Sequence, residues 1–532
     1  MLVACCPESY PNLPPDCQQP SAAAAASPCG IDTQAALLPD PRLRQRLGQI
    51  FASLAGHPGC SLPQALSSWA ATKAAYRFFA HPATSVANLL PALVLPAVRL
   101  GCSFLPCSSA DPFAAIRIIH DSTSFNFSHL RSATGLGFIN DSENARGLHL
   151  HSSLILSPQG VLLGVAHLHF WIRQQFRQES ADQRRRLPIE EKESFKWLLG
   201  VRAAVGRFAD CAGRPVRLIH AMDREGDVHE VFAEIRRLRQ DAVIRCCQDR
   251  RVQSRKGLPI SCSKAYVAAR PALGQTCLRV PTKLGRTRLA QVEMRSVQVR
   301  LMPDGDNYKG RKPLKLWLIE VRETGTPPAS EEPVRWWLWT TLPAKTAEQA
   351  IEVLSIYRSR WRLEEYHREM KTVGCDVEGL RLAAGERLMK AITIQAQVAA
   401  RVVQLRDKVR QSPRASCTGC FEEEEWQALW AWQHKRGWRA EDGEPTLEQV
   451  VRWLGRLGGH LGRKGDGLPG AEVLGRGLYA LAVLMQGRAL GKAEAQQSNN
   501  PQTTSSQAKP SSDGARAGPA VPPTPSHQHP RG

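Results

Sequence analysis

Three acidic residues lie where a metal-dependent phosphoryl-transfer enzyme needs carboxylates. Such chemistry uses two or three carboxylates that converge on divalent cations, which stabilise the attacking and leaving oxygens. Asp121 follows the apolar run 116–119 and Asp223 follows the apolar run 216–219, so both are predicted at strand ends. Glu364 is the third candidate. A single Asp at a strand end is more commonly a turn former or a helix cap, so only the three acids together indicate a metal site.

Helical spacing separates Glu364 from its acidic neighbours. An α-helix turns about 100° per residue, so four residues of the segment 357–371 project within a stripe about 60° wide. Glu365 and Glu369 fall on other faces. A solvated charged helix explains this segment equally well, and the rest of the chain must decide. The four aligned residues are Tyr357, Arg360, Glu364 and Lys371.

Size and charge indicate a folded protein that binds a polyanion. The 532 residues suggest about three domains. Seventy Lys and Arg against 49 Asp and Glu give a formal net charge of +21. A ribosomal or membrane-surface protein can share that charge, but here the excess is spread through stretches of ordinary apolar content. Nucleic acid is therefore the favoured partner.

Other common classes are disfavoured by specific residues. The 15 cysteines are odd in number and scattered, and no secretory signal is recognised, so we expect reduced thiols and a cytoplasmic protein. Cys417 and Cys420 form a lone CxxC without a second pair, which disfavours zinc. The apolar stretch 86–107 is interrupted by Pro91 and Pro96, so we expect no membrane insertion. No Walker-type loop is found, and no nucleotide cofactor is expected.

Periodicity divides the chain into helical and strand-rich parts. Helical patterns prevail at 32–105, where Arg42, Arg46 and Arg77 make a basic module. Short alternating strands dominate 247–341, and helices return from 342 onwards. The segments 1–31 and 493–532 have the composition of disordered chain. The chain is thus predicted to be α/β, with helical parts at both ends.

Residues close to these motifs receive structural interpretations. His149 and His151 share one side of a predicted strand, but no third ligand follows at a fitting spacing. We expect packing or a local hydrogen bond for both. Glu225 and Asp227 come directly after Asp223, and we expect them to cap or orient the next helix.

Short motifs around the three acids carry a family resemblance. Tyr-(2)-Arg-(3)-Glu-(6)-Lys at 357–371, His-Asp-Ser-Thr-Ser at 120–124, Asn-Ala-Arg-Gly-Leu-His-Leu-His-Ser at 144–152 and Asp-Arg-Glu-Gly-Asp at 223–227 are similar to motifs of one family. It is the cut-and-paste DNA transposases with an Asp-Asp-Glu triad, in particular the insertion-sequence-four family that includes the transposase of transposon Tn-five. Gly226 stands where that enzyme has Ala. The resemblance runs from about Pro39 to Leu490.

The resemblance implies a specific α/β fold. It consists of an RNase H-like catalytic domain, a mixed sheet flanked by helices, with an inserted antiparallel β unit and helical N-terminal and C-terminal domains. The expected segments are a disordered extension (1–31), a helical DNA-end-binding domain (32–105), the first part of the RNase H-like domain (106–246), the β-strand insertion (247–341), the last part of the RNase H-like domain (342–410), a helical dimerisation region (411–492) and a disordered tail (493–532).

The resemblance also implies a role for each site residue. Asp121, Asp223 and Glu364 would hold two Mg²⁺ or Mn²⁺ ions. Trp336 would stack on a base flipped out of a DNA hairpin, and Trp361 would be a second platform, with core packing the alternative for both and favoured for Trp361. The expected DNA contacts are Tyr357, Arg360, Lys371, Arg245, Arg42, Arg46 and Arg77.

These implications describe a bacterial transposase, cytoplasmic and nucleoid-associated when bound to DNA. As a homodimer it would bridge two transposon ends, cut both strands through a hairpin intermediate and join the 3′ ends to target DNA. Two alternatives stay open: an RNase H-like nuclease without strand transfer, and a non-catalytic DNA-binding inhibitor of transposition. The three intact acids argue against the inhibitor, because a binder gains nothing from carboxylates that face DNA.

Overall fold

The computed structural model describes most of the chain between residues 30 and 498. The described residues are 30–66, 68–105, 111–140, 142–176, 183, 187–282, 287–303, 312–371, 374–463 and 465–498. The predicted disordered extension 1–31 lies outside them except for its last two residues, and so does the predicted tail from residue 499. The tail was predicted to begin at 493, which is too early, because a helix continues through Ser498. Elements below belong to the unit Met1–Leu484, apart from the end of that helix.

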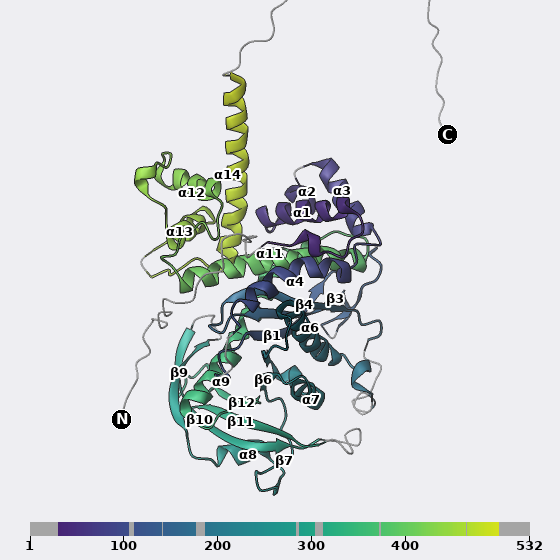
Figure 1. Cartoon of the computed structure of the whole chain (residues 1–532), viewed down its shortest axis with the longest axis vertical. Helices are drawn as coiled ribbons and strands as arrows, with labels where there is room; N and C mark the ends of the chain where they lie inside the picture. The colour runs from purple at the N-terminus through teal and green to yellow at the C-terminus, as the bar shows by residue number, and fades with distance from the viewer. Residues whose placement is uncertain are drawn as a thin grey trace, which may run out of the picture. The chain divides into compact units, whose positions relative to one another are not determined.

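A mixed β-sheet is the central element (Figure 1). Within the described residues its main path runs β2-β3-β1-β5-β6-β12-β11-β10-β7-β8, with β4 paired to β3 and β9 paired to β10. The strands are β1 (Arg117–Asn126), β2 (Gly137–Ile139), β3 (Ser142–Leu156), β4 (Leu162–Trp171), β5 (Ile219–Met222), β6 (Asp241–Arg245), β7 (Val252–Gln253), β8 (Pro259–Ile260), β9 (Gly274–Pro281), β10 (Thr287–Leu301), β11 (Leu314–Glu323) and β12 (Arg335–Thr340).

Strand direction divides this sheet into two parts. β1 is antiparallel to β3 and parallel to β5, and β5 is parallel to β6. From β12 onwards every pairing is antiparallel, as predicted for the strands at 247–341. β12 pairs directly with β6, so both parts form one continuous sheet.

Helices pack on both faces of the sheet. Neighbouring strand residues point to opposite faces, and Ile118 belongs to the cluster with α6, whereas Ile119 belongs to the cluster with α10 and α11. The helices are α1 (Pro41–Gly56), α2 (Leu62–Ala65), α3 (Trp69–Ala80), α4 (Val86–Cys102), α6 (Phe195–Ala212), α7 (His229–Arg237), α8 (Ser263–Ala268), α9 (Ala347–Ser359), α10 (Trp361–Lys371), α11 (Gly385–Gln411), α12 (Glu423–His434), α13 (Leu447–Leu457) and α14 (Ala471–Ser498). Short 3₁₀ turns are η2 (Thr33–Ala35), η3 (Ile189–Glu191), η4 (Arg224–Gly226), η6 (Val377–Gly379) and η7 (Ala440–Asp442).

The predicted strand end at Asp121 is wrong, whereas the one at Asp223 is confirmed. Asp121 lies in the middle of β1, because β1 pairs with β5 only as far as Ile119 and then continues along β3 to Asn126. β5 begins three residues later than predicted, and Asp223 follows it directly. The last pair between β1 and β5 is Ile119 with Ala221, and Asp121 and Asp223 each follow it by two residues. Both acids therefore lie at the same edge of the parallel ladder.

The predicted continuous helix over 357–371 is divided at Arg360. Arg360 ends α9 with right-handed dihedral angles (φ −56°, ψ −27°), and α10 begins at Trp361. The amphipathic helix after Asp223 is confirmed as α7. A capping box of Thr446 and Gln449 opens α13, whose predicted apolar face is buried.

The N-terminal region is helical, as predicted. Asp40 caps α1, whose first residue is Pro41, a favoured start for a helix. Pro91 and Pro96 were expected to break the stretch 86–107, but α4 runs through both. No helix in the described ranges has the length and apolarity needed to cross a membrane. All cysteines that the structure describes are free thiols.

A buried ionic network fixes α10 to α11. Arg406 pairs with Glu365 and lies 3.4 Å from the Asp407 Oδ1 atom. Arg362 Nε lies 3.0 Å from the other oxygen of Asp407. The side chains of Arg406 and Asp407 are 3% and 2% exposed. Since α10 carries Glu364, this network determines where that carboxylate lies.

Removal of Arg406 should therefore destabilise the protein strongly. Arg406→Met leaves two buried carboxylates short of a partner, and we expect the free energy of unfolding to fall by about 3–5 kcal/mol. Urea denaturation measures it. The control is Arg452→Met, which removes an exposed pair with Glu448 and should cost less than about 1 kcal/mol. Equal losses in the two variants would contradict the proposed anchoring.

Candidate active site

The three predicted acids line one cavity of about 420 Å³. They come from three elements that are distant in sequence: β1, the turn after β5, and the first turn of α10. Two predicted basic residues, Arg360 and Lys371, line the same cavity. The full lining is Asp121, Ser122, Asp223, Arg360, Glu364, His367, Arg368 and Lys371.

Local backbone structure places each carboxylate. Asp121 lies opposite Ser152 of β3, on the sheet face that α10 covers, and accepts a hydrogen bond from the Ser122 N–H at 2.8 Å. Asp223 caps η4 by accepting the Glu225 N–H at 2.9 Å. Glu364 projects from α10 with its side chain 37% exposed. The carboxylate on the helix is thus more exposed than that of Asp121, whose side chain is 17% exposed.

Arg360 is the counter-ion of two of these acids. Its Nη1 atom lies 2.5 Å from Asp121 Oδ2, and its Nη2 atom lies 2.6 Å from Glu364 Oε1. The guanidinium is 13% exposed, so it bridges β1 and α10 inside the cavity. The sequence predicted that Arg360 contacts DNA, and the structure places it between the carboxylates.

The acids lie close enough to affect one another's ionisation. Burial raises the pKa of Asp121 to about 6; Arg360 opposes this rise, and the nearby Asp223 and Glu364 carboxylates add to it. Burial also raises the pKa of Asp223, with a further contribution from Glu225. The three acids share the cavity with three basic residues, Arg360, Arg368 and Lys371.

The donor chemistry fits a hard divalent cation. Carboxylate oxygens are the ligands that Mg²⁺ prefers, and Mn²⁺ accepts the same set. Within the described part of the chain, no three His, Cys, Asp or Glu side chains stand close enough to form a ready metal site. The guanidinium of Arg360 contacts both Asp121 and Glu364.

Trp336, Tyr357 and Arg245 form a cluster from β12, α9 and β6. The rings of Trp336 and Tyr357 meet edge to face with centroids 5.7 Å apart. The Arg245 guanidinium lies 5.3 Å from the centre of the Trp336 ring. Trp336 is half-buried and Tyr357 is buried. The structure thus brings three of the predicted DNA contacts together.

The remaining predicted contacts are scattered. Trp361 is 47% exposed at the start of α10, so the core packing favoured for it is wrong. Lys371 lines the cavity, and burial lowers its pKa. Arg42 and Arg46 on α1 and Arg77 on α3 lie outside this cavity, and Arg42 and Arg77 are exposed.

Two acids beside Asp223 have roles that the sequence did not predict. Glu225 pairs with Lys196 of α6 at 3.1 Å. Asp227 accepts hydrogen bonds from the Cys247 N–H at 2.7 Å and Arg250 Nε at 3.0 Å. The predicted capping of α7 is therefore wrong for both, since the N-cap of that helix is Val228 and has no side-chain hydrogen bond.

Histidines near the acids are held by hydrogen bonds. His149 and His151 contact the Phe138 carbonyl and the Ser122 hydroxyl at 3.0 Å each, which confirms the local bonds predicted for them. Sequence reasoning missed His367, which lines the cavity and lies 3.1 Å from the Ser152 hydroxyl. Its position three residues after Glu364 is a signal that helical spacing could have used.

The raised pKa of Asp121 predicts a pH-dependent stability. Because folding raises this pKa from 3.8 to about 6, the folded state binds the proton more tightly than the unfolded chain, and this stabilisation is lost as pH rises through about 6. Between pH 4 and pH 8 the free energy of unfolding of the wild type should therefore fall by about 2–3 kcal/mol relative to that of Asp121→Asn. Urea denaturation in EDTA at the two pH values measures it. A pH-independent difference would contradict the ionisation of Asp121.

Comparison with known proteins gives family matches in two segments of the sequence, one before and one after the cavity residues. Residues 32–84 match the family described as "Transposase DNA-binding", and residues 397–497 match the family described as "Transposase Tn5 dimerisation domain". Among solved structures, a piggyBac transposase synaptic complex with hairpin DNA aligns with 9% identity and a TM-score of 0.29. That alignment covers 73% of this chain and 59% of the other, so the chain spans less than two thirds of that protein.

The two family matches frame the acidic cavity along the sequence. The first contains α1 and α3 with the predicted basic residues, and the second contains the end of α11 and all of α12 and α13. The cavity residues lie between them, in neither match. Residues 32–84 thus match a transposase DNA-binding domain and residues 397–497 match a Tn5 dimerisation domain, and both matches support a Tn5-like transposase.

Proposed function

We propose that this protein is a Tn5-like transposase that cuts DNA at transposon ends and joins the freed ends to target DNA in metal-dependent reactions. One observation carries the proposal: Asp121, Asp223 and Glu364, from three separate elements, line a single cavity. That cavity lies in the part of the sequence between a DNA-binding match and a dimerisation match. A non-catalytic binder has no use for three acids in one cavity with basic neighbours.

The proposed catalytic domain is RNase H-like. Support comes from the strand order β4-β3-β1-β5-β6, in which β3 is antiparallel to both of its neighbours and the others are parallel to β1. We assign β7 to β12 to an insertion that enters after β6 and returns before α9. The insertion brings Trp336 beside Tyr357 of α9.

Asp121, Asp223 and Glu364 would hold two Mg²⁺ or Mn²⁺ ions, which supply stabilisation of the attacking and leaving oxygens of the displacement. The chain's own basic groups then bind the substrate. Arg360 would donate both arms of its guanidinium to a DNA phosphate. Lys371, at the other end of α10, gives a second positive charge.

A hairpin intermediate requires a base to leave the stack. Trp336 would stack on the extruded base, because it is half-buried and its ring is held edge to face by Tyr357. Arg245 lies over the same ring and would hold the adjoining phosphate. Trp361, exposed at the start of α10, is a second candidate platform.

Two transposon ends would be bridged by a homodimer. The dimerisation match includes α14, on which Tyr479 and Val483 are 42% and 48% exposed. Exposed large apolar residues on one helix are typical of a surface that another protein covers. The catalytic sites of the two subunits would then act on paired ends.

Excision from a plasmid that carries the element's own terminal repeats tests the proposal. With Mg²⁺ we expect Asp121→Asn, Asp223→Asn and Glu364→Gln to bind end DNA but to lose cleavage by about a thousandfold or more, since each removes a metal ligand. Glu352→Gln, an exposed acid on α9, is the matched control and should keep activity. An acid variant with full cleavage would remove that residue from the site.

The wild-type products separate the alternatives. Cleavage without joining to target DNA would indicate a nuclease. Binding of ends without any cleavage would indicate an inhibitor of transposition. Cleavage that needs no terminal repeat would contradict recognition of transposon ends.

The hairpin step has its own test. Trp336→Ala should leave the first nick close to wild type and reduce hairpin formation about 10- to 100-fold, the effect of losing one stacked base. Trp336→Phe keeps an aromatic face and should restore most of the hairpin product. Denaturing gel electrophoresis of labelled ends measures nicks and hairpins together. An equal loss of nicking would show instead that Trp336 supports the fold of the site.

A further inference from the structure

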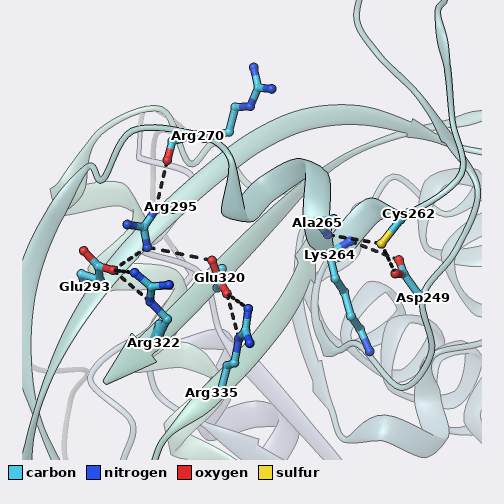
Figure 2. A network of polar contacts seen from close by, with 10 residues as sticks. All are labelled: Asp249, Cys262, Lys264, Ala265, Arg270, Glu293, Arg295, Glu320, Arg322 and Arg335. Carbon is cyan, nitrogen blue, oxygen red and sulfur yellow. Dashed lines mark hydrogen bonds and ion pairs between the residues drawn. The ribbon is translucent and has the colours of Figure 1, made fainter. Parts of the chain in front are cut away.

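The strands β10, β11 and β12 carry an arginine cluster that the proposed chemistry does not use. Its members face one another across the strands: Arg295 lies opposite Glu320, and Arg322 lies opposite Arg335. Figure 2 shows their guanidinium and carboxylate groups in contact across the three strands. The arginine cluster is defined as Arg295, Arg322 and Arg335 with the glutamates Glu293 and Glu320.

Each glutamate holds arginines in fixed positions. Glu293 Oε1 accepts hydrogen bonds from Arg295 Nη1 at 2.6 Å and from Arg322 Nη2 at 2.5 Å. Glu320 Oε1 accepts from Arg335 Nε at 3.0 Å. Arg295 Nη1 lies 4.0 Å from the other oxygen of Glu320. The three guanidiniums therefore form one ordered array.

Burial puts the negative charge inside and the positive charge outside. The Glu320 and Glu293 side chains are 0% and 11% exposed, whereas those of Arg322 and Arg335 are 44% and 50% exposed. Three arginines against two glutamates also leave a net positive charge. A ligand that approaches this surface meets guanidinium groups whose orientation is already set, so little side-chain entropy is lost on binding.

This face is opposite to the one that carries Trp336. Adjacent strand residues point to opposite faces, so Trp337 lies on the face of the arginine cluster, opposite Glu320. Lys264 and Arg335 lie 4.8 Å and 4.9 Å from the Trp337 ring centre. In Figure 2 the Arg270 side chain points away from the network, while its carbonyl accepts from Arg295. The positive surface thus extends beyond the cluster itself.

We propose that the arginine cluster binds the phosphate backbone of a DNA duplex, without sequence preference, on the sheet face opposite to Trp336. Planar guanidinium groups match phosphate oxygens, and a duplex presents one negative charge per about 1.7 Å of its axis. Arg322 and Arg335 lie on neighbouring strands, which are about 4.8 Å apart, so both can reach one DNA strand. The inference rests on the proposed function only for the choice of DNA as the polyanion.

Binding of a labelled duplex that lacks terminal repeats, with the full chain in EDTA, tests this proposal. Arg322→Gln with Arg335→Gln should weaken binding about tenfold at low salt and make the slope of log K against log [salt] shallower by about two. The matched control is Arg202→Gln with Arg237→Gln, in which two exposed arginines share the buried Glu234. That variant loses the same charge elsewhere and should change binding less than twofold.

A variant that removes negative charge distinguishes an effect on DNA binding from an effect on folding. Glu293→Gln removes a carboxylate but keeps all three arginines, so we expect tighter binding and a steeper salt slope. A folding defect would weaken binding in every variant. The proposal is overturned if the variant with Arg322→Gln and Arg335→Gln binds DNA like the wild type, or if the control variant loses as much affinity. It is also overturned if Glu293→Gln weakens binding. Because neither metal nor transposon ends are present, a failure of the proposed cleavage would leave this result unaffected.

Discussion

The ion pairs of Arg360 with Asp121 and Glu364 are the interaction on which the candidate site depends. Without a cation, the carboxylates of Asp121 on β1 and Glu364 on α10 would repel each other. Arg360 supplies that cation from the junction of α9 and α10. The same guanidinium is well suited to phosphate, and under the proposed function it would also bind DNA. One arginine therefore serves both the packing of the cavity and the proposed binding of DNA.

Periodicity identified most elements but not their exact limits. The alternation at 334–340 and the apolar spacing after Asp223 led to β12 and α7, because burial on one face imposes a pattern on the residues themselves. Asp121 was placed at a strand end because a local pattern cannot show which partner strand stops first. The break at Arg360 has no Pro or Gly to mark it. Arg360 at this break pairs with Asp121, which is remote in sequence, and with Glu364, four residues on.

Local spacing predicted part of the cavity lining. Helical spacing joined Arg360, Glu364 and Lys371, and these three do line one cavity with both aspartates. Lys196 carries no such signal, although it pairs with Glu225 beside Asp223, because its position depends on how α6 packs against the sheet. Asp227 looked like a helix cap and instead holds Arg250. Contacts between elements remote in sequence are the part that local reasoning cannot provide.

Arginine beside a buried carboxylate recurs through the chain, and it explains how a strongly basic protein keeps acids inside. Glu234, Glu320 and Glu365 are each paired with arginine while their own side chains are mostly buried. Where the arginines are themselves buried, as Arg406 is, the pair fixes two helices together. Where they are exposed, as Arg335 is, the same pairing orients positive charge toward solvent. Burial of the arginine thus decides whether such a pair serves the fold or a surface that can meet DNA.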